Sequence, residues 1–133
     1  MSLCFVLVSQ RTGTVIGTTR FMDIALAHKR LEIGATWVTR AHQRTGANVE
    51  AKLLLLTHAF DVVGVQKVVL KTETLNEQSR RAILALGATE EGTLRRQFLA
   101  DTGRARDMVY FSVLDNEWPA VRERLLARLA RFE

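Results

Sequence analysis

The sequence predicts a mixed α/β fold. Runs rich in valine, isoleucine, threonine and aromatic residues alternate along the chain with leucine- and alanine-rich runs of helical spacing, and polar turns that contain glycine separate them. The chain of 133 residues has the length of one domain, and no repeat, low-complexity tract or linker divides it. We therefore expect residues 1–133 to form a single domain.

The first third of the chain predicts three strands. Residues 5–24 contain two β-rich runs separated by the polar link Arg11-Thr12-Gly13-Thr14, whose glycine suits a tight hairpin turn. Residues 31–39, LEIGATWVT, form another strand-like run, in which Gly34 indicates a bulge or a close approach. That strand leads directly into a polar loop at residues 43–48.

A strand, helix, strand unit is predicted around this loop. Residues 48–63 are mostly helix formers, with Glu50 in the first turn and Gly64 where a C-terminal cap belongs. The helix is apolar on nearly all sides, so we expect it to be largely buried. Residues 65–74 then alternate as a strand does.

A second helix and a long hairpin are expected next. Thr74-Leu75-Asn76-Glu77 matches the capping-box pattern, and the helix that it opens stops at Gly87. Residues 88–115 contain two strand-like runs around Asp101-Thr102-Gly103, and the second run, MVYFSVL, is apolar enough to be central in the sheet.

The last predicted element is an amphipathic helix over residues 118–132. Apolar side chains recur there at helical spacing, and arginines occupy the other face. Asn116 is the expected N-cap, and Pro119 falls in the first turn.

Composition excludes several classes of protein. The apolar fraction of 47% and charged fraction of 25% are those of a water-soluble globular domain, and no apolar run is long enough to span a membrane. Cys4 is the only cysteine, so an internal disulfide and the usual zinc-ligand spacings are excluded, and we expect Cys4 to be a small buried strand residue. We expect no metal, and a cytoplasmic setting because the sequence has no secretory leader.

The net charge of +5 leaves two kinds of ligand open. The arginines that dominate it are spread along the chain without a basic arm or tail, which makes nucleic acid an unfavoured partner. A basic protein also suits a small ligand that carries several phosphates. A solvated arginine-rich surface explains the same composition without any ligand.

The candidate phosphate site is the loop of residues 43–48, QRTGAN. It lies between a strand and an apolar helix whose first amide groups have no partners within the helix, and Gly46 permits a ligand to approach closely. The loop is neither a Walker loop nor a dinucleotide fingerprint, because the residues that those motifs require are missing. The alternative is an ordinary helix N-terminus with an incidental glycine. If the loop binds a phosphate, Gly46→Val should abolish binding and leave the fold intact.

The order of these features resembles the GNAT superfamily of N-acetyltransferases, and within it the branch that includes the ribosomal-protein alanine N-acetyltransferases. The loop of that superfamily reads Gln/Arg-x-x-Gly-x-Gly/Ala, and Gln43, Gly46 and Asn48 occupy its fixed positions. Asn48 departs from the pattern, although asparagine tolerates unusual backbone angles better than most residues. A second family feature is matched by Asn76, Ser79 and the step Leu86-Gly87. The resemblance covers residues 5–115.

This resemblance implies a central, mostly antiparallel twisted sheet flanked by helices, and acetyl-CoA as cosubstrate. The pyrophosphate would lie on the amides of Arg44 through Asn48, and the pantetheine arm beside the strand end, where the amide of Val38 would polarise the thioester carbonyl. Asn76 would hydrogen-bond to the pantetheine, and the adenine end would lie near Ser79. The implied cofactor-binding residues are Trp37, Val38, Gln43, Arg44, Thr45, Gly46, Ala47, Asn48, Asn76 and Ser79.

Acetyl transfer to an amine also requires a base for the amine and a proton donor for the leaving thiolate. Glu32, on the strand before the loop, is the candidate base, and the alternative is a carboxylate on a solvated strand face. Ser79 or Tyr110 could donate the proton, whereas a helix cap for Ser79 and packing in the hairpin core for Tyr110 are the alternatives.

Members of the family usually begin with a strand and two helices that line the acceptor side, and this sequence starts at what resembles their second strand. We therefore expect an N-terminally truncated GNAT-like domain with an exposed sheet edge, and association into a homodimer or higher oligomer. The predicted function is direct acetyl transfer from acetyl-CoA to a protein N-terminus or a small amine. The alternative is a non-catalytic CoA-binding or basic nucleic-acid-binding module.

Overall fold

The structure, a computed structural model, describes residues 2–132, without the side chain of residue 35. Its strands are Leu3–Val8 (β1), Val15–Ala25 (β2), Arg30–Val38 (β3), Lys67–Glu73 (β4), Thr89–Leu99 (β5) and Ala105–Leu114 (β6). Its α-helices are Ala47–Thr57 (α1), Glu77–Ala85 (α2) and Trp118–Ala130 (α3), and α1 continues as a π-helical segment, His58–Val63 (η3). Two short 3₁₀ turns, Leu26–His28 (η1) and Arg40–His42 (η2), flank β3.

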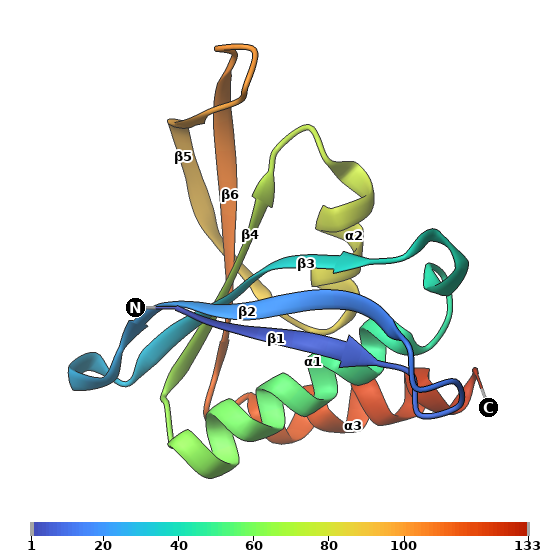
Figure 1. Ribbon diagram of the computed structural model, residues 1–133. Helices are drawn as coiled ribbons and strands as arrows, with labels where there is room; N and C mark the ends of the chain where they lie inside the picture. Colours follow the sequence, from blue (N-terminus) through green and yellow to red (C-terminus); the bar gives the residue numbers. More distant parts are fainter. Residues whose placement is uncertain (1, 133) are drawn as a thin grey trace.

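The six strands form one sheet in the order β1-β2-β3-β4-β6-β5 (Figure 1). All neighbours pair antiparallel except β3 and β4, which are parallel because α1 and η3 return the chain between them. The mixed, mostly antiparallel sheet confirms the predicted fold class. It also confirms both predicted hairpins and the central place of β6.

The three helices share one hydrophobic core with one face of the sheet. Leu56 of α1, Ile83 of α2 and Leu125 of α3 belong to the same buried cluster as Phe21, Leu31, Ile33, Val68 and Phe111. Because successive strand residues point to opposite faces, Glu32, Lys71 and Tyr110 lie on the other face of the sheet. No helix of the described chain packs on that face at these residues, so they can take part in a site.

The parallel strands part soon after they meet. Only Arg30 to Glu32 of β3 pair with Lys67 to Val69 of β4, and beyond those residues the strands diverge (Figure 1). A bulge in β3 begins beside Gly34. Thr18 of β2 pairs with Trp37 and Arg20 pairs with Gly34, so two steps along β2 correspond to three steps along β3, which has one extra residue here. The predicted bulge is confirmed, and a gap opens between β3 and β4 at the same level.

Two predicted helix starts are wrong in detail. Asn76, and not Thr74, is the N-cap of α2, because its Oδ1 accepts a hydrogen bond of 3.1 Å from the amide of Ser79. At α3 the N-cap position belongs to Glu117, one residue after the predicted Asn116, and no side chain caps the helix. The predicted ends are confirmed: Gly64 and Gly87 follow their helices with φ angles of +80° and +104°.

Two burial predictions are also wrong. The helix predicted over residues 48–63 is not largely buried, since seven of its residues are exposed, among them Leu54 and Val62 at 62% and 69%. Cys4 is exposed, because β1 is an edge strand and Cys4 lies on the face opposite the helices.

Candidate active site

The loop between β3 and α1 is held in shape by its own side chains. Gln43 Nε2 donates to the carbonyl of Val38 at 3.2 Å, and the hydroxyl of Thr45 donates to the carbonyl of His42 at 2.5 Å. The same hydroxyl accepts from the amide of Ala47 at 3.3 Å. Arg44 turns the chain, with a φ of +60° that side chains rarely adopt.

Several amides of this loop are available to a ligand. Within residues 2–132, the N–H groups of Arg44, Thr45, Gly46, Asn48 and Val49 have no protein acceptor. They lie at the N-terminus of α1, where the helix dipole favours negative charge. The predicted anion site therefore has the free donors that it needs.

Gly46 allows the loop to pack closely against α3, a role that the loop motif does not indicate. Its φ of −69° and ψ of −4° suit any residue. A Cβ atom there would lie 3.1 Å from Leu129 Cδ1 and 3.2 Å from Phe132 Cβ, so the glycine lets the loop pack against the end of α3. A valine at this position would require Leu129 and Phe132 to shift, so the expectation that Gly46→Val leaves the fold intact depends on how far the end of α3 can give way and stays a prediction. Asn48 lies within α1, so its departure from the family pattern requires no unusual backbone angle.

The end of β3 presents backbone groups to the gap. The amide of Thr39 donates a hydrogen bond of 2.7 Å to the carbonyl of Ile16 in β2. Along a strand, the backbone groups of successive residues point alternately to the two sides. The N–H and C=O of Val38 consequently point away from β2 and into the gap, where the C=O meets Gln43. Trp37 has its side chain 58% exposed, whereas Val38 is buried beside the helices.

Lys52 of α1 ties the helix to the bulge of β3. Its Nζ donates to Thr36 Oγ1 at 2.9 Å, and Thr36 Oγ1 shares a further hydrogen bond of 2.9 Å with Thr19 Oγ1 of β2. Burial lowers the pKa of Lys52 to about 8, and within the described chain it has no carboxylate partner. Three elements are thus fastened together at the level where the gap opens.

Glu32 lies at the apex of the gap, in its last pair with β4. It is only 3% exposed, so the alternative of a solvated strand face is excluded. Lys71 Nζ lies 2.9 Å from Glu32 Oε2, although the angle there is outside hydrogen-bond geometry and this buried oxygen has no hydrogen-bond partner in the described chain. Burial raises the pKa of Glu32 above its ordinary value, the Lys71 ammonium opposes that rise, and the Asp23 carboxylate adds to it.

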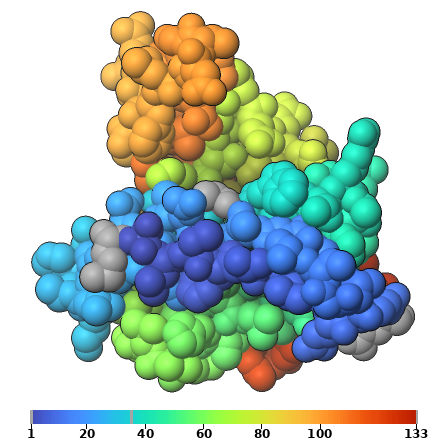
Figure 2. Space-filling model, viewed as in Figure 1, coloured from blue at the N-terminus to red at the C-terminus, as the bar shows by residue number. Residues whose placement is uncertain are grey.

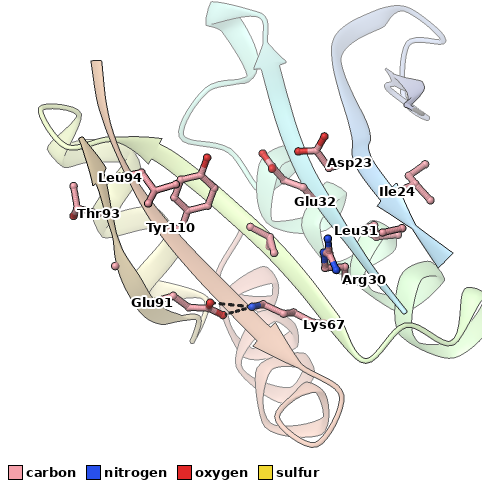
Figure 3. A pocket seen from close by; sticks show the side chains of 13 residues that line it. Asp23, Ile24, Arg30, Leu31, Glu32, Lys67, Glu91, Thr93, Leu94 and Tyr110 are labelled. Atoms are coloured by element: carbon pink, nitrogen blue, oxygen red, sulfur yellow. Dashed lines mark hydrogen bonds and ion pairs between the residues drawn. The ribbon is translucent and has the colours of Figure 1, made fainter. Parts of the chain in front are cut away.

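A cavity of about 720 Å³ surrounds this carboxylate on the face of the sheet opposite the helices. Figure 3 shows Asp23 and Glu32 side by side at one end, Tyr110 facing them, and the ion pair of Lys67 and Glu91 at the other end. In Figure 2 the β5–β6 hairpin rises above the layer of β1–β3, and the surface steps inward where the two meet. The volume suits a small organic ligand or the end of a longer one.

The predicted catalytic residues are brought together only in part. Tyr110 lines the cavity with Glu32, so it does not merely pack in the hairpin core. Ser79 lies in the first turn of α2, where its amide is capped by Asn76, and it is not among the residues that line the cavity. Asn76 and Ser79 are placed on the β4 side of the gap, where α2 begins.

The roles predicted for Val38 and Glu32 exclude each other. Their partners on β2, Met22 and Gly17, are five positions apart, so the bulge leaves about 17 Å between Glu32 and Val38 at ~3.4 Å per residue. A carbonyl held by the Val38 amide would therefore lie far outside the reach of the Glu32 carboxylate. Only one of the two can contact the acetyl group.

A second hollow, of about 400 Å³, lies between the loop and α2. Arg44, Gln78 and Arg81 line it. Two guanidinium groups at this place would attract phosphate groups that reach beyond the loop amides. The sequence reasoning missed Gln78 and Arg81, because only the fold places the first turns of α2 opposite the loop.

Lys71 and Asp23 were also missed. Lys71 alternates with Lys67 and Val69 along one strand face, which is an ordinary solvated pattern. Asp23 did carry a signal, since aspartate is disfavoured inside a strand. Among the described residues, no cluster of three or more His, Cys, Asp or Glu side chains could hold a metal ion. No helix within residues 2–132 is both long and apolar enough to cross a membrane.

Residues 1–89 match the family model described as the acetyltransferase (GNAT) domain. The chain belongs to the GNAT acetyltransferase family. This membership confirms the resemblance first seen in the loop, and GNAT proteins generally use acetyl-CoA as cosubstrate. The free loop amides and the two arginines fit the phosphates of such a molecule.

Three relatives show the extent of the likeness. This GNAT chain is 31% identical over 103 residues to the uncharacterized N-acetyltransferase YoaA of Bacillus subtilis, an alignment that covers 77% of this chain and 57% of that protein. It is 28% identical over 106 residues to YdaF of the same organism, named as a candidate ribosomal N-acetyltransferase, over 80% of this chain and 57% of YdaF. The crystal structure of a GCN5-related N-acetyltransferase from Brucella melitensis matches with a TM-score of 0.90 at 35% identity, over 96% of this chain and 57% of that one. The chain thus spans somewhat more than half the length of these relatives.

Proposed function

We propose that this GNAT domain transfers an acetyl group from acetyl-CoA to a primary amine. The single observation that carries the proposal is the course of the β3–β4 gap, which runs from a loop with free amides to a buried carboxylate in an open cavity. The gap is lined by unpaired strand edges, which suit an extended, amide-containing arm. A phosphate end and a reacting end are therefore accommodated at opposite ends of one channel.

The phosphate end is assigned to the loop. The free amides of Arg44, Thr45, Gly46 and Asn48 and the dipole of α1 would hold the pyrophosphate, while the amide of Ala47 is bonded to Thr45. Arg44 and Arg81 would neutralise the charge of the phosphates. Gln43 shapes the loop by bonding to Val38 and is not free to be a primary ligand. The remaining predicted contacts of the pantetheine arm and the adenine end are Trp37, Val38, Asn76 and Ser79.

The reacting end is assigned to the apex of the gap. In this proposal an amide of the bulge at residues 34–36, which begins two positions after Glu32, polarises the thioester carbonyl, whereas the amide of Val38 binds the arm. Gly34 keeps this place open, because a Cβ atom there would lie 2.7 Å from Met22 Sδ and 3.4 Å from Glu32 Oε2.

The proposed transfer is direct. The neutral amine nitrogen attacks the thioester carbonyl carbon, the carbon–sulfur bond breaks, and the amine proton passes to the Glu32 carboxylate. The thiolate of CoA takes a proton from Tyr110, which we prefer to Ser79 because Tyr110 and Glu32 line the same cavity. Glu32 then releases its proton to solvent and Tyr110 regains one from solvent, both through the open cavity, so that the site returns to its starting state.

Glu32→Gln tests this assignment. The variant keeps the shape of the side chain but cannot accept a proton, so kcat should fall about 10²- to 10⁴-fold. Thiol release with a panel of amines measures the rate, and calorimetric titration with acetyl-CoA should give the same affinity as the unsubstituted protein. A variant that keeps its kcat would show that Glu32 is not the base.

The rival function is a passive module that binds CoA or nucleic acid. The net charge of +5 is the observation that favours it. Binding of acetyl-CoA without thiol release by any amine would support a passive CoA-binding module, and the absence of binding would contradict both CoA readings. A cytoplasmic setting is proposed with the enzyme, because a lone free cysteine suits a reducing compartment.

A further inference from the structure

The backbone of β2 is distorted where it approaches the cavity. Met22 pairs with Glu32, and Ala25 pairs with Arg30. Between these two pairs, β2 therefore has two residues where β3 has one. The extra residue makes a bulge at residues 23–24, and bulges often redirect a side chain beside an active site. Asp23 has a φ of +45°, a left-handed conformation that costs a non-glycine residue about 1 kcal/mol or more.

The effect of this bulge is to place a second carboxylate against Glu32. Figure 3 shows the Asp23 and Glu32 carboxylates adjacent at the end of the cavity, and their repulsion contributes to the perturbation of Glu32. Within the described chain, Asp23 forms no ion pair with any cation. Folding has therefore set two acidic groups together, although like charges at such a distance destabilise the protein.

The charges around these carboxylates do not balance. Lys71 Nζ, 2.9 Å from Glu32 Oε2, supplies one positive charge against two carboxylates. The ionisable groups that line the same cavity from the other strands are Arg30 of β3, Lys67 of β4, Glu91 of β5 and Tyr110 of β6. Lys67 and Glu91 neutralise each other at 2.8 Å, and no ion pair joins Arg30 to either carboxylate. When both carboxylates are ionised, this end of the cavity lacks one positive charge.

Apolar side chains form part of the wall beside the carboxylates. Val69, Leu94 and the ring of Tyr110 line this part, whereas Thr93 and the charged groups named above line the rest. Glu32 Oε2, in a residue that is 97% buried, lacks a hydrogen-bond partner in the described chain and faces this space. A ligand that fits would place an N–H donor with positive charge on the carboxylates and a hydrocarbon group on the apolar wall.

We propose that Asp23 and Glu32 bind the ammonium group of the acceptor, and that the acceptor is a primary amine carried on an apolar chain. This inference rests on the proposed acetyltransferase function and names the substrate class of the same site. The acceptor enters as an ammonium ion, gives up one proton to solvent through the open cavity, and the resulting amine attacks the thioester as described. Asp23 takes no part in the proton transfer, so it is a binding residue that selects for charge, and Glu32 is the base.

Asp23→Asn tests the inference. Asparagine has the same shape and adopts left-handed backbone angles readily, so the bulge should persist. The probes are butylamine and an alanine peptide amide, which represent a small amine and a protein N-terminus. For at least one probe, KM should rise about 10- to 100-fold, because one charged hydrogen bond to the amine is lost. The value of kcat should stay within about threefold, and the affinity for acetyl-CoA measured by calorimetry should be unchanged. A response of butylamine supports an amine on an apolar chain, and a response of the alanine peptide alone would overturn that part of the inference.

The matched control is Asp101→Asn, which makes the same change of charge in the exposed turn of the β5–β6 hairpin and should leave KM unaltered. A titration with butylamine in the absence of acetyl-CoA, monitored by NMR, separates this inference from the proposed function. Butylamine binding that Asp23→Asn weakens, in a protein that releases no thiol, would support the ammonium site while the enzyme function fails. An unchanged KM for both probes in Asp23→Asn, or equal binding of butylamine and butanol, would overturn the inference.

Discussion

The central residue of this GNAT domain, Glu32, depends on its neighbours for its charge. A buried carboxylate tends to be protonated, and a protonated Glu32 cannot act as a base. Lys71 offsets that tendency from 2.9 Å away, and it is itself enclosed, with Nζ 4.9 Å from the ring centroid of Phe98. The two aromatic rings beside Lys71, Phe98 and Tyr110, restrict where its ammonium can move.

Lys71→Met should make the enzyme require a higher pH. Without the ammonium, the pKa of Glu32 rises further, and because the base works only when ionised, the acid limb of kcat/KM moves to higher pH. At neutral pH the loss should be about tenfold or more and should recover as the pH rises. A pH–rate profile measures the limb.

The control is Lys67→Met, four residues earlier on the same strand face. Lys67 pairs with Glu91 and not with Glu32, so its removal should leave the acid limb in place. Identical profiles for Lys71→Met and the unsubstituted protein would show that Lys71 does not tune the base.

At the scale of elements, the start of α1 combines two duties. The helix contributes free amides to the loop, and its Lys52 is bonded to the bulge of β3, so the phosphate end and the strand that carries Glu32 form one unit. Gly46 adds a third contact through its close packing on α3. Side-chain substitutions in the loop therefore disturb packing and ligand contacts together.

Asn48→Pro removes an amide without adding a side chain to that packing. Asn48 is the second residue of α1, and Pro119 already occupies the second position of α3, so this fold accommodates proline there. Loss of one free N–H should weaken acetyl-CoA binding about tenfold, measured by calorimetry, with the free energy of unfolding changed by about 1 kcal/mol or less.

Asn48→Ala is the matched control, because it deletes the side chain and keeps the amide. Its affinity should equal that of the unsubstituted protein. If Asn48→Pro also binds acetyl-CoA normally, the loop amides do not hold the phosphates and the loop is only the start of a helix.

The whole molecule is a sheet covered on one face. A single buried cluster joins all three α-helices to strands β2, β3, β4 and β6, and this continuity supports the prediction of one domain over residues 1–133. The edge strand β1 exposes Leu3, Val6 and Val8, each at least half exposed. Such an edge favours association with a further strand or surface.

We predict that the protein forms a homodimer or higher oligomer at micromolar concentration. Burial of the exposed apolar side chains of β1 provides the driving force. Light scattering measures the mass, and Val6→Lys, which places a charge on that edge, should shift the equilibrium toward the monomer. A clean monomer of the unsubstituted protein would contradict the prediction.

Much of the fold was predictable because its signals are local. The hairpin turn at residues 11–14 and the stops at Gly64 and Gly87 follow from backbone preferences of single residues. The cap of α2 was missed because Thr74 and Asn76 both precede the helix, and only the path of the chain decides which of them reaches a free amide. The burial of residues 47–63 was overestimated, since composition does not reveal how many sides of a helix other elements cover.

Local patterns predicted the succession of strands and helices along the chain, the candidate phosphate loop and Glu32 as a candidate base, because propensities, turns and motifs act over a few neighbouring residues. The tertiary structure was needed to show where β3 and β4 part, because this depends on pairing between strands that are far apart in the sequence. It alone placed Asp23 and Lys71 on the Glu32 carboxylate, and Gly46 against α3. These contacts depend on strand register and on bulges, and a shift of one residue would turn each side chain to the opposite face.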